Sequence, residues 1–266
     1  MAEVLISPGV LARENDQSQI TSQPVQAGAA IIGPTVKGQQ NIPKLVTSYS
    51  EYEAAFGSTF LSGSNQYTFF TSISAYNYFQ NGGTSLLVTK AAPGTWNAAT
   101  SSYIITGSSI APGAGFGSSG DSPFMLETLS HGKMMNSAQL GTTGGADGSN
   151  NTLPSGSSDN VRWEIASPNS SSGVFSVLIR QGNDTGTAKQ VIETFSNLSL
   201  DPLATNYISK VIGDQVQTVR GASGDRYLQT SGSYANASKF VRVKQVNFQT
   251  PNYLDNAGDP KDIYTT

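Results

Sequence analysis

Residues 174–180 read Val-Phe-Ser-Val-Leu-Ile-Arg, so Val174, Ser176 and Leu178 would point to one side of a strand and Phe175, Val177 and Ile179 to the other. Successive side chains of a β-strand point to opposite sides, so this alternation predicts a strand with one well-buried face and one partly buried face. The next four residues, 181–184, read Gln-Gly-Asn-Asp, and glycine and asparagine in such a run favour a turn. The strand is therefore expected to end at this turn.

Two helices are predicted to follow the turn. The first depends on apolar residues that recur at helical spacing, namely Val191, Ile192 and Phe195. The second begins at Asp201-Pro202, because aspartate is a favoured N-cap and proline is tolerated at the first helical position. Its apolar stripe consists of Leu203, Tyr207 and Val211, and Gly213 ends it. Residues 174–214 therefore predict a strand–helix–helix packing unit.

Residues 25–91 combine short apolar runs with helical patterns. Three β-prone runs predict strands, at residues 29–32, 44–47 and 85–90. A short helix is expected to begin at Ser50, since Glu53 three residues later completes a capping box. A longer helix is expected over residues 67–80, where Asn-Gly-Gly then stops it. The alternation of strands and helices predicts a sheet with helices packed on it.

The longer helix carries large apolar side chains at helical spacing. The stripe comprises Phe69, Ile73, Tyr76 and Phe79, with Phe70 beside it. Such a stripe normally packs on the core. A ligand site is the alternative, and the core is the favoured interpretation.

From Ala92 onward the composition changes. Two stretches, 106–123 and 141–158, are rich in glycine and serine and predict long loops. Further strands are expected at 161–165, 215–220 and 239–248. The fold class is therefore predicted as α+β, with three parts. These are an extended arm over 1–24, an α/β part over 25–91 and a β-rich domain over 92–266.

The arm begins with a β-prone apolar run interrupted by Ser7-Pro8-Gly9. Its apolar residues are Val4, Leu5, Ile6, Val10 and Leu11. Proline excludes a central strand, but pairing at a sheet edge is still allowed. The residues alone are compatible equally with a frayed terminus and with a strand donated to another subunit.

Charged residues make up 12% of the chain, against about 25% in ordinary globular domains. A surface with so few charges is tolerated best when it packs against other proteins. The net charge is −3 and the lysines and arginines are scattered, which disfavours direct nucleic-acid binding. No apolar run approaches the ~20 residues that a membrane span needs, and the amino terminus lacks the pattern of a signal peptide.

No set of residues in the sequence has the composition and spacing of a catalytic or metal site. The chain has no cysteine and one histidine, His131, which excludes disulfides and His-rich or Cys-based metal sites. Asp121-Ser122 with His131 lacks the nucleophile elbow of a serine hydrolase. Asp147 and Asp159 are separated only by uncharged residues, unlike a calcium loop. The Gly-rich run 33–38 lacks Walker spacing. We therefore expect neither enzymatic activity nor a cofactor or metal.

The chain resembles the sheath subunit of contractile phage tails and related contractile injection machines. Five segments carry the resemblance: Ile6-Ser7-Pro8-Gly9-Val10 with Arg13-Glu14; residues 29–38 with 45–48 and 52–57; residues 78–83 with 86–89; Pro93-Gly94-Thr95-Trp96-Asn97; and residues 195–202 with 207–212. Each segment is weak alone, but together they run in order over most of residues 1–214.

The resemblance implies a structural protein. Sheath subunits stack as hexameric rings in a helical sleeve around a tail tube, and contraction drives the tube through the host envelope. The implied partners are neighbouring copies, the tail tube protein, the baseplate and the tail terminator, with no direct nucleic-acid contact and no membrane insertion. The implied location is the virion tail, after synthesis in the host cytoplasm. Arms in this family extend the sheets of neighbours, which favours strand donation by Val4, Leu5, Ile6, Val10 and Leu11.

Two departures from the family stand out. The family has a carboxy-terminal half that completes the core and carries a second arm, and no counterpart is found here, so the chain is expected to be an amino-terminal portion. Residues 98–160 match no family segment. The alternative function is a β-rich phage adhesin that binds surface glycans, which would present exposed tyrosine and tryptophan platforms. Trp96 and Trp163 lie far apart in the sequence.

Overall fold

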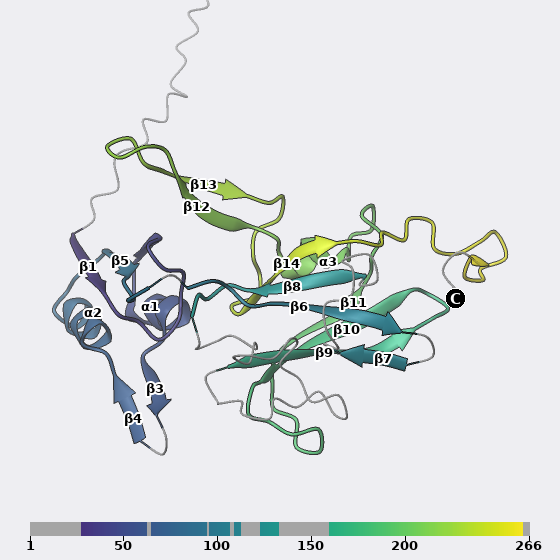
Figure 1. The fold of residues 1–266 in the computed structure, drawn as a ribbon, viewed down its shortest axis with the longest axis horizontal. Helices are drawn as coiled ribbons and strands as arrows, with labels where there is room; N and C mark the ends of the chain where they lie inside the picture. The colour runs from purple at the N-terminus through teal and green to yellow at the C-terminus, as the bar shows by residue number, and fades with distance from the viewer. Residues whose placement is uncertain are drawn as a thin grey trace, which may run out of the picture.

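The computed structural model describes residues 28–62, 65–94, 96–106, 109–112, 123–132 and 160–262. These residues form a smaller α/β part and a larger β-rich part, which lie side by side (Figure 1). The mixed composition, with few helices and many strands in small sheets, confirms the broad α+β class. Among the described residues, no helix has both the length and the apolar character needed to cross a membrane.

The α/β part is built on a three-stranded sheet. Its strands are β1 (Ala29–Gly33), β2 (Pro43–Val46) and β5 (Leu86–Lys90), in the order β1-β5-β2. β1 runs parallel to β5 and β2 runs antiparallel to it. All three strands were expected from their apolar runs. The helices α1 (Tyr49–Phe56) and α2 (Phe70–Gln80) share one core with the sheet, made of Val46, Tyr52, Phe56, Ala75, Leu86 and Val88.

The start of α1 differs from the predicted capping box at Ser50. Ser48 is the N-cap, and its hydroxyl accepts a hydrogen bond from the Glu51 N–H at 3.2 Å. The Glu51 carboxylate accepts in return from the Thr47 N–H at 2.9 Å. Ser48 and Glu51 thus have the predicted capping-box spacing, two residues earlier in the chain. The cap lies at Ser48 because this residue has the extended backbone that an N-cap requires.

The predicted start of α2 is wrong, and its predicted core face is right only in part. The helix begins at Phe70 rather than near Tyr67, because β4 (Asn65–Thr68) pairs with β3 (Thr59–Ser62) in a hairpin. Its sheet side carries the small residues Thr71, Ser72 and Ala75, whereas Phe70 is 85% exposed. A Cβ added at Gly33 of β1 would lie 2.4 Å from Thr71 Oγ1, so no large side chain fits at this point. Ile73 and Tyr76 of the predicted stripe are exposed, whereas Phe79 near the end of the helix packs against the core as expected.

The β-rich part contains two main sheets. One has the order β14-β8-β6-β7, with β6 (Thr100–Thr106), β7 (Ser109–Pro112), β8 (Phe124–Thr128) and β14 (Val241–Val246). The other has the order β11-β10-β9, with β9 (Val161–Asn169), β10 (Val174–Gln181) and β11 (Val191–Leu198). Their shared core includes Phe124, Leu126, Val177, Ile179, Leu198, Val241 and Val243. A separate hairpin, β12 (Val216–Arg220) with β13 (Tyr227–Ser231), reaches over the α/β part (Figure 1).

The predicted strand–helix–helix unit is wrong in its middle. Residues 191–198 form strand β11, antiparallel to β10, because β-branched residues at its start suit a strand and the free edge of β10 supplies backbone partners. Asp201 caps a turn, accepting from the Leu203 N–H at 2.9 Å. The helix α3 spans only Ile208–Ile212, and it ends at Gly213 as predicted.

Gly213 gives a first prediction about stability. It has a φ of +102°, and a Cβ there would lie 2.3 Å from the Asn236 Cα. Gly82 has a similar φ of +86° with no atom within 4 Å of the corresponding position. We expect Gly82→Ala to cost about 1–2 kcal/mol of unfolding free energy, which is the penalty for a left-handed alanine. Gly213→Ala should cost about 1–3 kcal/mol more, because the backbone at Asn236 must also move.

Urea unfolding of both variants measures this difference directly. Equal losses in the two variants would show that the contact between Gly213 and Asn236 contributes nothing.

Candidate functional site

Among the described residues, α1 and α2 cover one face of the α/β sheet, and the β12–β13 hairpin lies across a groove from part of the other face. Strand alternation places Ala30, Leu87 and Leu45 next to one another on the other face, in register across the sheet. Ile32 lies on this face and is 75% exposed. Apolar residues usually face a core, so this face has the composition of a surface that another chain covers.

The edges of the same sheet are open. Within the described residues, β1 and β2 each pair along their length with β5 alone, so the outer edge of each lacks a partner strand. A free edge presents unpaired N–H and C=O groups, and these can bind an extended segment of another chain. The strand exchange predicted for the arm requires an open edge of this kind. The predicted donor residues, Val4, Leu5, Ile6, Val10 and Leu11, lie outside the described residues.

A groove runs along β2 between the two parts of the molecule. Its apolar lining includes Leu45 and Leu87 from the α/β part and Leu228 from the β12–β13 hairpin. Ala54 and Ala55 of α1 line its flank, and Gln217 and Thr230 of the hairpin lie opposite. The groove has a volume of about 760 Å³. The residues that line this groove are far apart in the chain, so no local sequence pattern indicates it.

A polar clasp joins the two parts beside the groove. The His131 N–H donates to the Gly38 carbonyl at 3.2 Å, and the Gly38 N–H donates to Ser130 Oγ at 3.0 Å. The Gln40 N–H donates to His131 Nδ1 at 3.3 Å. Lys37 places its ammonium group over the Phe240 ring, 5.2 Å from the centroid. These contacts fix the orientation of one part against the other.

The clasp contains the single histidine and a buried lysine. Lys90 Nζ donates to the His131 carbonyl at 2.9 Å, and burial lowers the pKa of Lys90 to about 8. Burial also lowers the pKa of His131; Lys90 lowers it further, while Glu127 opposes the shift. Because Nδ1 already accepts from Gln40, this nitrogen is not free to act as a general base. Asp121 and Ser122, the other members of the hydrolase candidate, lie outside the described residues.

The Gly-rich run 33–38 serves as a connection and not as a phosphate cradle. The Lys37 N–H donates to the Phe56 carbonyl at 3.0 Å, and the Gly38 N–H is taken by Ser130. These two amides are therefore unavailable to an anion, which supports the interpretation of the run as a turn after β1.

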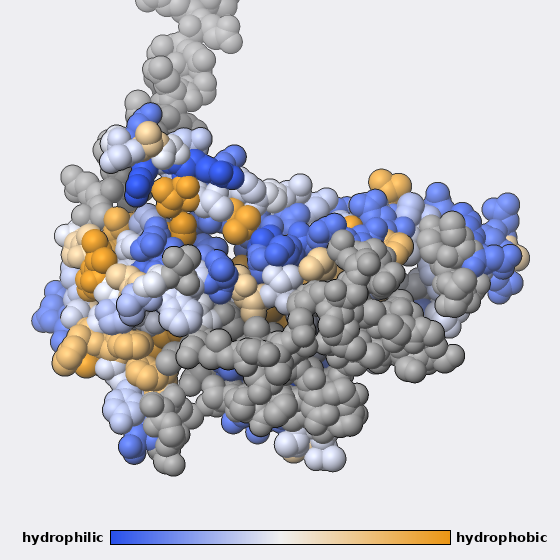
Figure 2. All heavy atoms as spheres, viewed as in Figure 1, coloured by the Kyte–Doolittle hydropathy of each residue, from blue (hydrophilic) through white to orange (hydrophobic). Residues whose placement is uncertain are grey.

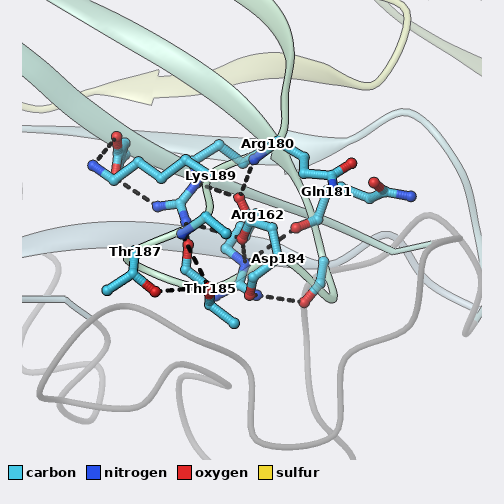
Figure 3. A network of polar contacts seen from close by, with 11 residues as sticks. Arg162, Arg180, Gln181, Asp184, Thr185, Thr187 and Lys189 are labelled. Carbon is cyan, nitrogen blue, oxygen red and sulfur yellow. Dashed lines mark hydrogen bonds and ion pairs between the residues drawn. The ribbon is translucent and has the colours of Figure 1, made fainter.

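A buried ion network holds the β9–β10 hairpin (Figure 3). Arg180 is fully buried and donates to Glu164 at 2.6 Å and to Asp184 at 2.7 Å. Asp184 also pairs with Arg162 Nε at 3.0 Å and accepts from the Gln190 N–H at 2.8 Å. Its groups are paired with one another, so the network has a structural role: it fixes residues 181–190 on the hairpin.

The described residues contain no group of three or more acidic or histidine side chains that could hold a metal ion. The calcium-loop candidate, Asp147 to Asp159, lies outside them. No protein-family model matches the chain, and none of the curated proteins compared with it matches its sequence.

The ion network predicts a large effect of Asp184→Ala. Removing this carboxylate leaves two buried arginines without their shared partner, so we expect a loss of about 3–5 kcal/mol in unfolding free energy. The matched control is Lys189→Ala, which removes the partly exposed end of the same network, where Lys189 pairs with Glu164 at 2.8 Å. That change should cost about 1 kcal/mol or less. Chemical denaturation measures the unfolding free energy of both variants. A loss for Asp184→Ala as small as that for Lys189→Ala would contradict the structural role of the network.

The clasp predicts a pH dependence of stability. His131 has a folded-state pKa below its ordinary value of 6.5, so the unfolded chain binds the proton more readily. The stability from neutral His131 is complete above pH 6.5 and is lost as the pH falls below it.

The control for this effect is His131→Asn, whose Oδ1 can accept from the Gln40 N–H without titrating. We expect the free energy of unfolding of the wild type, relative to the variant, to fall between about pH 7 and about pH 5. A difference that stays constant with pH would show that His131 does not contribute.

Proposed function

We propose that this chain is a structural subunit of a contractile tail sheath, which polymerises as stacked hexameric rings around a tail tube. The observation that carries the proposal is the α/β sheet, which among the described residues has two open edges and an apolar face that no helix covers. A subunit held in a polymer by strands from its neighbours needs such a sheet. The resemblance in sequence to sheath subunits is the reason for proposing stacked hexameric rings in particular.

In this proposal the α/β part belongs to the sheath core and the β-rich part forms the protruding domain. The arm residues Val4, Leu5, Ile6, Val10 and Leu11 add a strand to a neighbouring sheet. An arm that makes about five main-chain hydrogen bonds, at about 0.5–1.5 kcal/mol each, contributes a few kcal/mol. Repetition of this contact around a ring and between rings makes the sleeve durable.

In this proposal contraction needs no catalytic site. The energy is stored in metastable packing between subunits and released when they rearrange. The proposed partners are other copies of the chain, the tail tube protein, the baseplate and the tail terminator. The proposed location is the virion.

The adhesin alternative receives less support from the aromatic residues. Trp96 Nε1 donates to the Pro93 carbonyl at 2.8 Å, and Trp163 packs on Phe124 with a centroid separation of 5.5 Å. The two tryptophans are thus engaged in separate local contacts and form no common platform for a sugar.

Electron microscopy of the full chain tests the proposal. We expect tubular polymers, whereas an adhesin or an enzyme would form a small discrete oligomer. Deletion of residues 1–23 removes the arm, so we expect a folded protein whose polymers lose cohesion. Normal assembly of this deletion would show that the arm claim is wrong.

A second variant tests the receiving surface. Ile32→Lys places a charge on the uncovered sheet face, so it should weaken assembly without unfolding the chain. Leu203→Lys is the matched control, because Leu203 is 81% exposed, close to the 75% of Ile32, but lies in the β-rich part. Equal assembly of the two variants would contradict a role for the sheet face.

A further inference from the structure

The outer side of α2 is a convex apolar surface. Phe70, Ile73 and Tyr76, which we call the α2 ridge, lie at successive three-residue steps and are all exposed. Phe60 and Phe69 stack at 4.7 Å beside its beginning and extend the apolar area. Figure 2 shows hydrophobic residues gathered over α2 and the base of the β3–β4 hairpin. A ridge of this kind fits the pattern by which a helix docks into a hydrophobic groove.

The segment that carries the ridge has no charge. The sequence contains no aspartate, glutamate, lysine, arginine or histidine between Glu53 and Lys90. A nucleic acid or a charged peptide would therefore find no ion pair on the α2 ridge. The surface that fits it is apolar, with uncharged polar groups around it.

The groove along β2 offers an apolar floor, and three charged side chains also line it. Its floor and wall carry Leu45, Leu87 and Leu228, and its neighbouring polar groups are mainly amides and hydroxyls. The charged residues that line it are Lys44, Glu51 and Lys239. Its volume of about 760 Å³ lies within the roughly 300–1,000 Å³ typical of small-molecule pockets, so it has room for a few large side chains.

The ridge and the groove lie at opposite edges of the same sheet. α2 packs on β1, whereas the groove follows β2, and the sheet order is β1-β5-β2. A single copy therefore cannot insert its own ridge into its own groove. Two different surfaces that complement each other produce a head-to-tail contact, and repetition of that contact gives rings or helical filaments.

We propose that the α2 ridge of one copy inserts into the groove between β2 and the β12–β13 hairpin of a second copy. This inference rests on the proposed function, since it names a contact by which copies of the chain associate. It is separate from the arm, which adds a strand and does not need α2. Insertion would cover the exposed aromatic residues of one copy and the leucines of the other.

Because the chain has no cysteine, disulfide cross-linking can test this contact without background. The single variants Ile73→Cys and Leu228→Cys place one thiol on the ridge and one in the groove. After mixing and mild oxidation, we expect cross-linked dimers that contain one copy of each variant. Each variant oxidised alone should give no dimer.

The other outcomes identify other occupants. Dimers of Ile73→Cys alone would show that ridge pairs with ridge, and would overturn the proposal. Loss of the mixed cross-link when residues 1–23 are deleted from both variants would assign the contact to the arm instead. If polymers form but the mixed cross-link does not, the ridge–groove contact is wrong and the sheath proposal still stands. If the full chain forms no polymer and no cross-link, both proposals are wrong.

A charge on the ridge gives an independent measurement. Ile73→Lys should weaken self-association by about tenfold or more, because a groove that already carries Lys44 and Lys239 would have to take in and desolvate a further ammonium group. The control is Ile192→Lys on β11, since Ile192 is 42% exposed and Ile73 is 43% exposed. Analytical ultracentrifugation compares the two, with circular dichroism to verify the fold. Equal association of both variants would overturn the ridge–groove contact.

Discussion

The close contact between α2 and β1 determines the surface of the α/β part. A Cβ at Gly33 would lie 2.4 Å from Thr71 Oγ1, so only small side chains fit between the helix and this strand. Thr71, Ser72 and Ala75 occupy that side, and the aromatic rings of the core come from Tyr52 and Phe56 of α1. Phe70, Ile73 and Tyr76 of α2 consequently lie on the outside, whereas Tyr78 and Phe79 near the end of the helix pack against the core. The exposed ridge follows from this contact.

Local sequence signals predicted some strands and missed others, among them β8 and also β7, which lies within the predicted loop 106–123. The alternation in residues 174–180 identified β10, and three apolar runs identified β1, β2 and β5. Periodicity recognised α2 as amphipathic, but it could not tell that small residues, and not Ile73 and Tyr76, face the sheet. In residues 191–198 the spacing suggested a helix, whereas β-branched residues and a free edge on β10 favoured a strand. In that segment, tertiary pairing outweighed a local pattern.

The interaction surfaces were less predictable than the strands. The groove combines residues from β2, α1 and the β12–β13 hairpin, which only the tertiary fold brings together. The ion network had one visible clue, the four-residue spacing of Arg180 and Asp184, but Arg162 and Glu164 join it through the register of β9 on β10. The sequence shows directly that the segment before Lys90 has no charged residue. This property bears on binding only because the outer side of α2 is exposed.

The groove has walls on two different parts of the molecule. β2 belongs to the α/β part and the β12–β13 hairpin to the β-rich part, while the clasp of Gly38, Gln40, Ser130 and His131 fixes their relative angle. The width of the groove is therefore a function of that angle. A rotation of one part against the other would reshape this surface. In the assembly proposed above, such a composite surface would couple the internal geometry of each subunit to its contact with the next, so that a change in one copy would be passed mechanically along a row of copies.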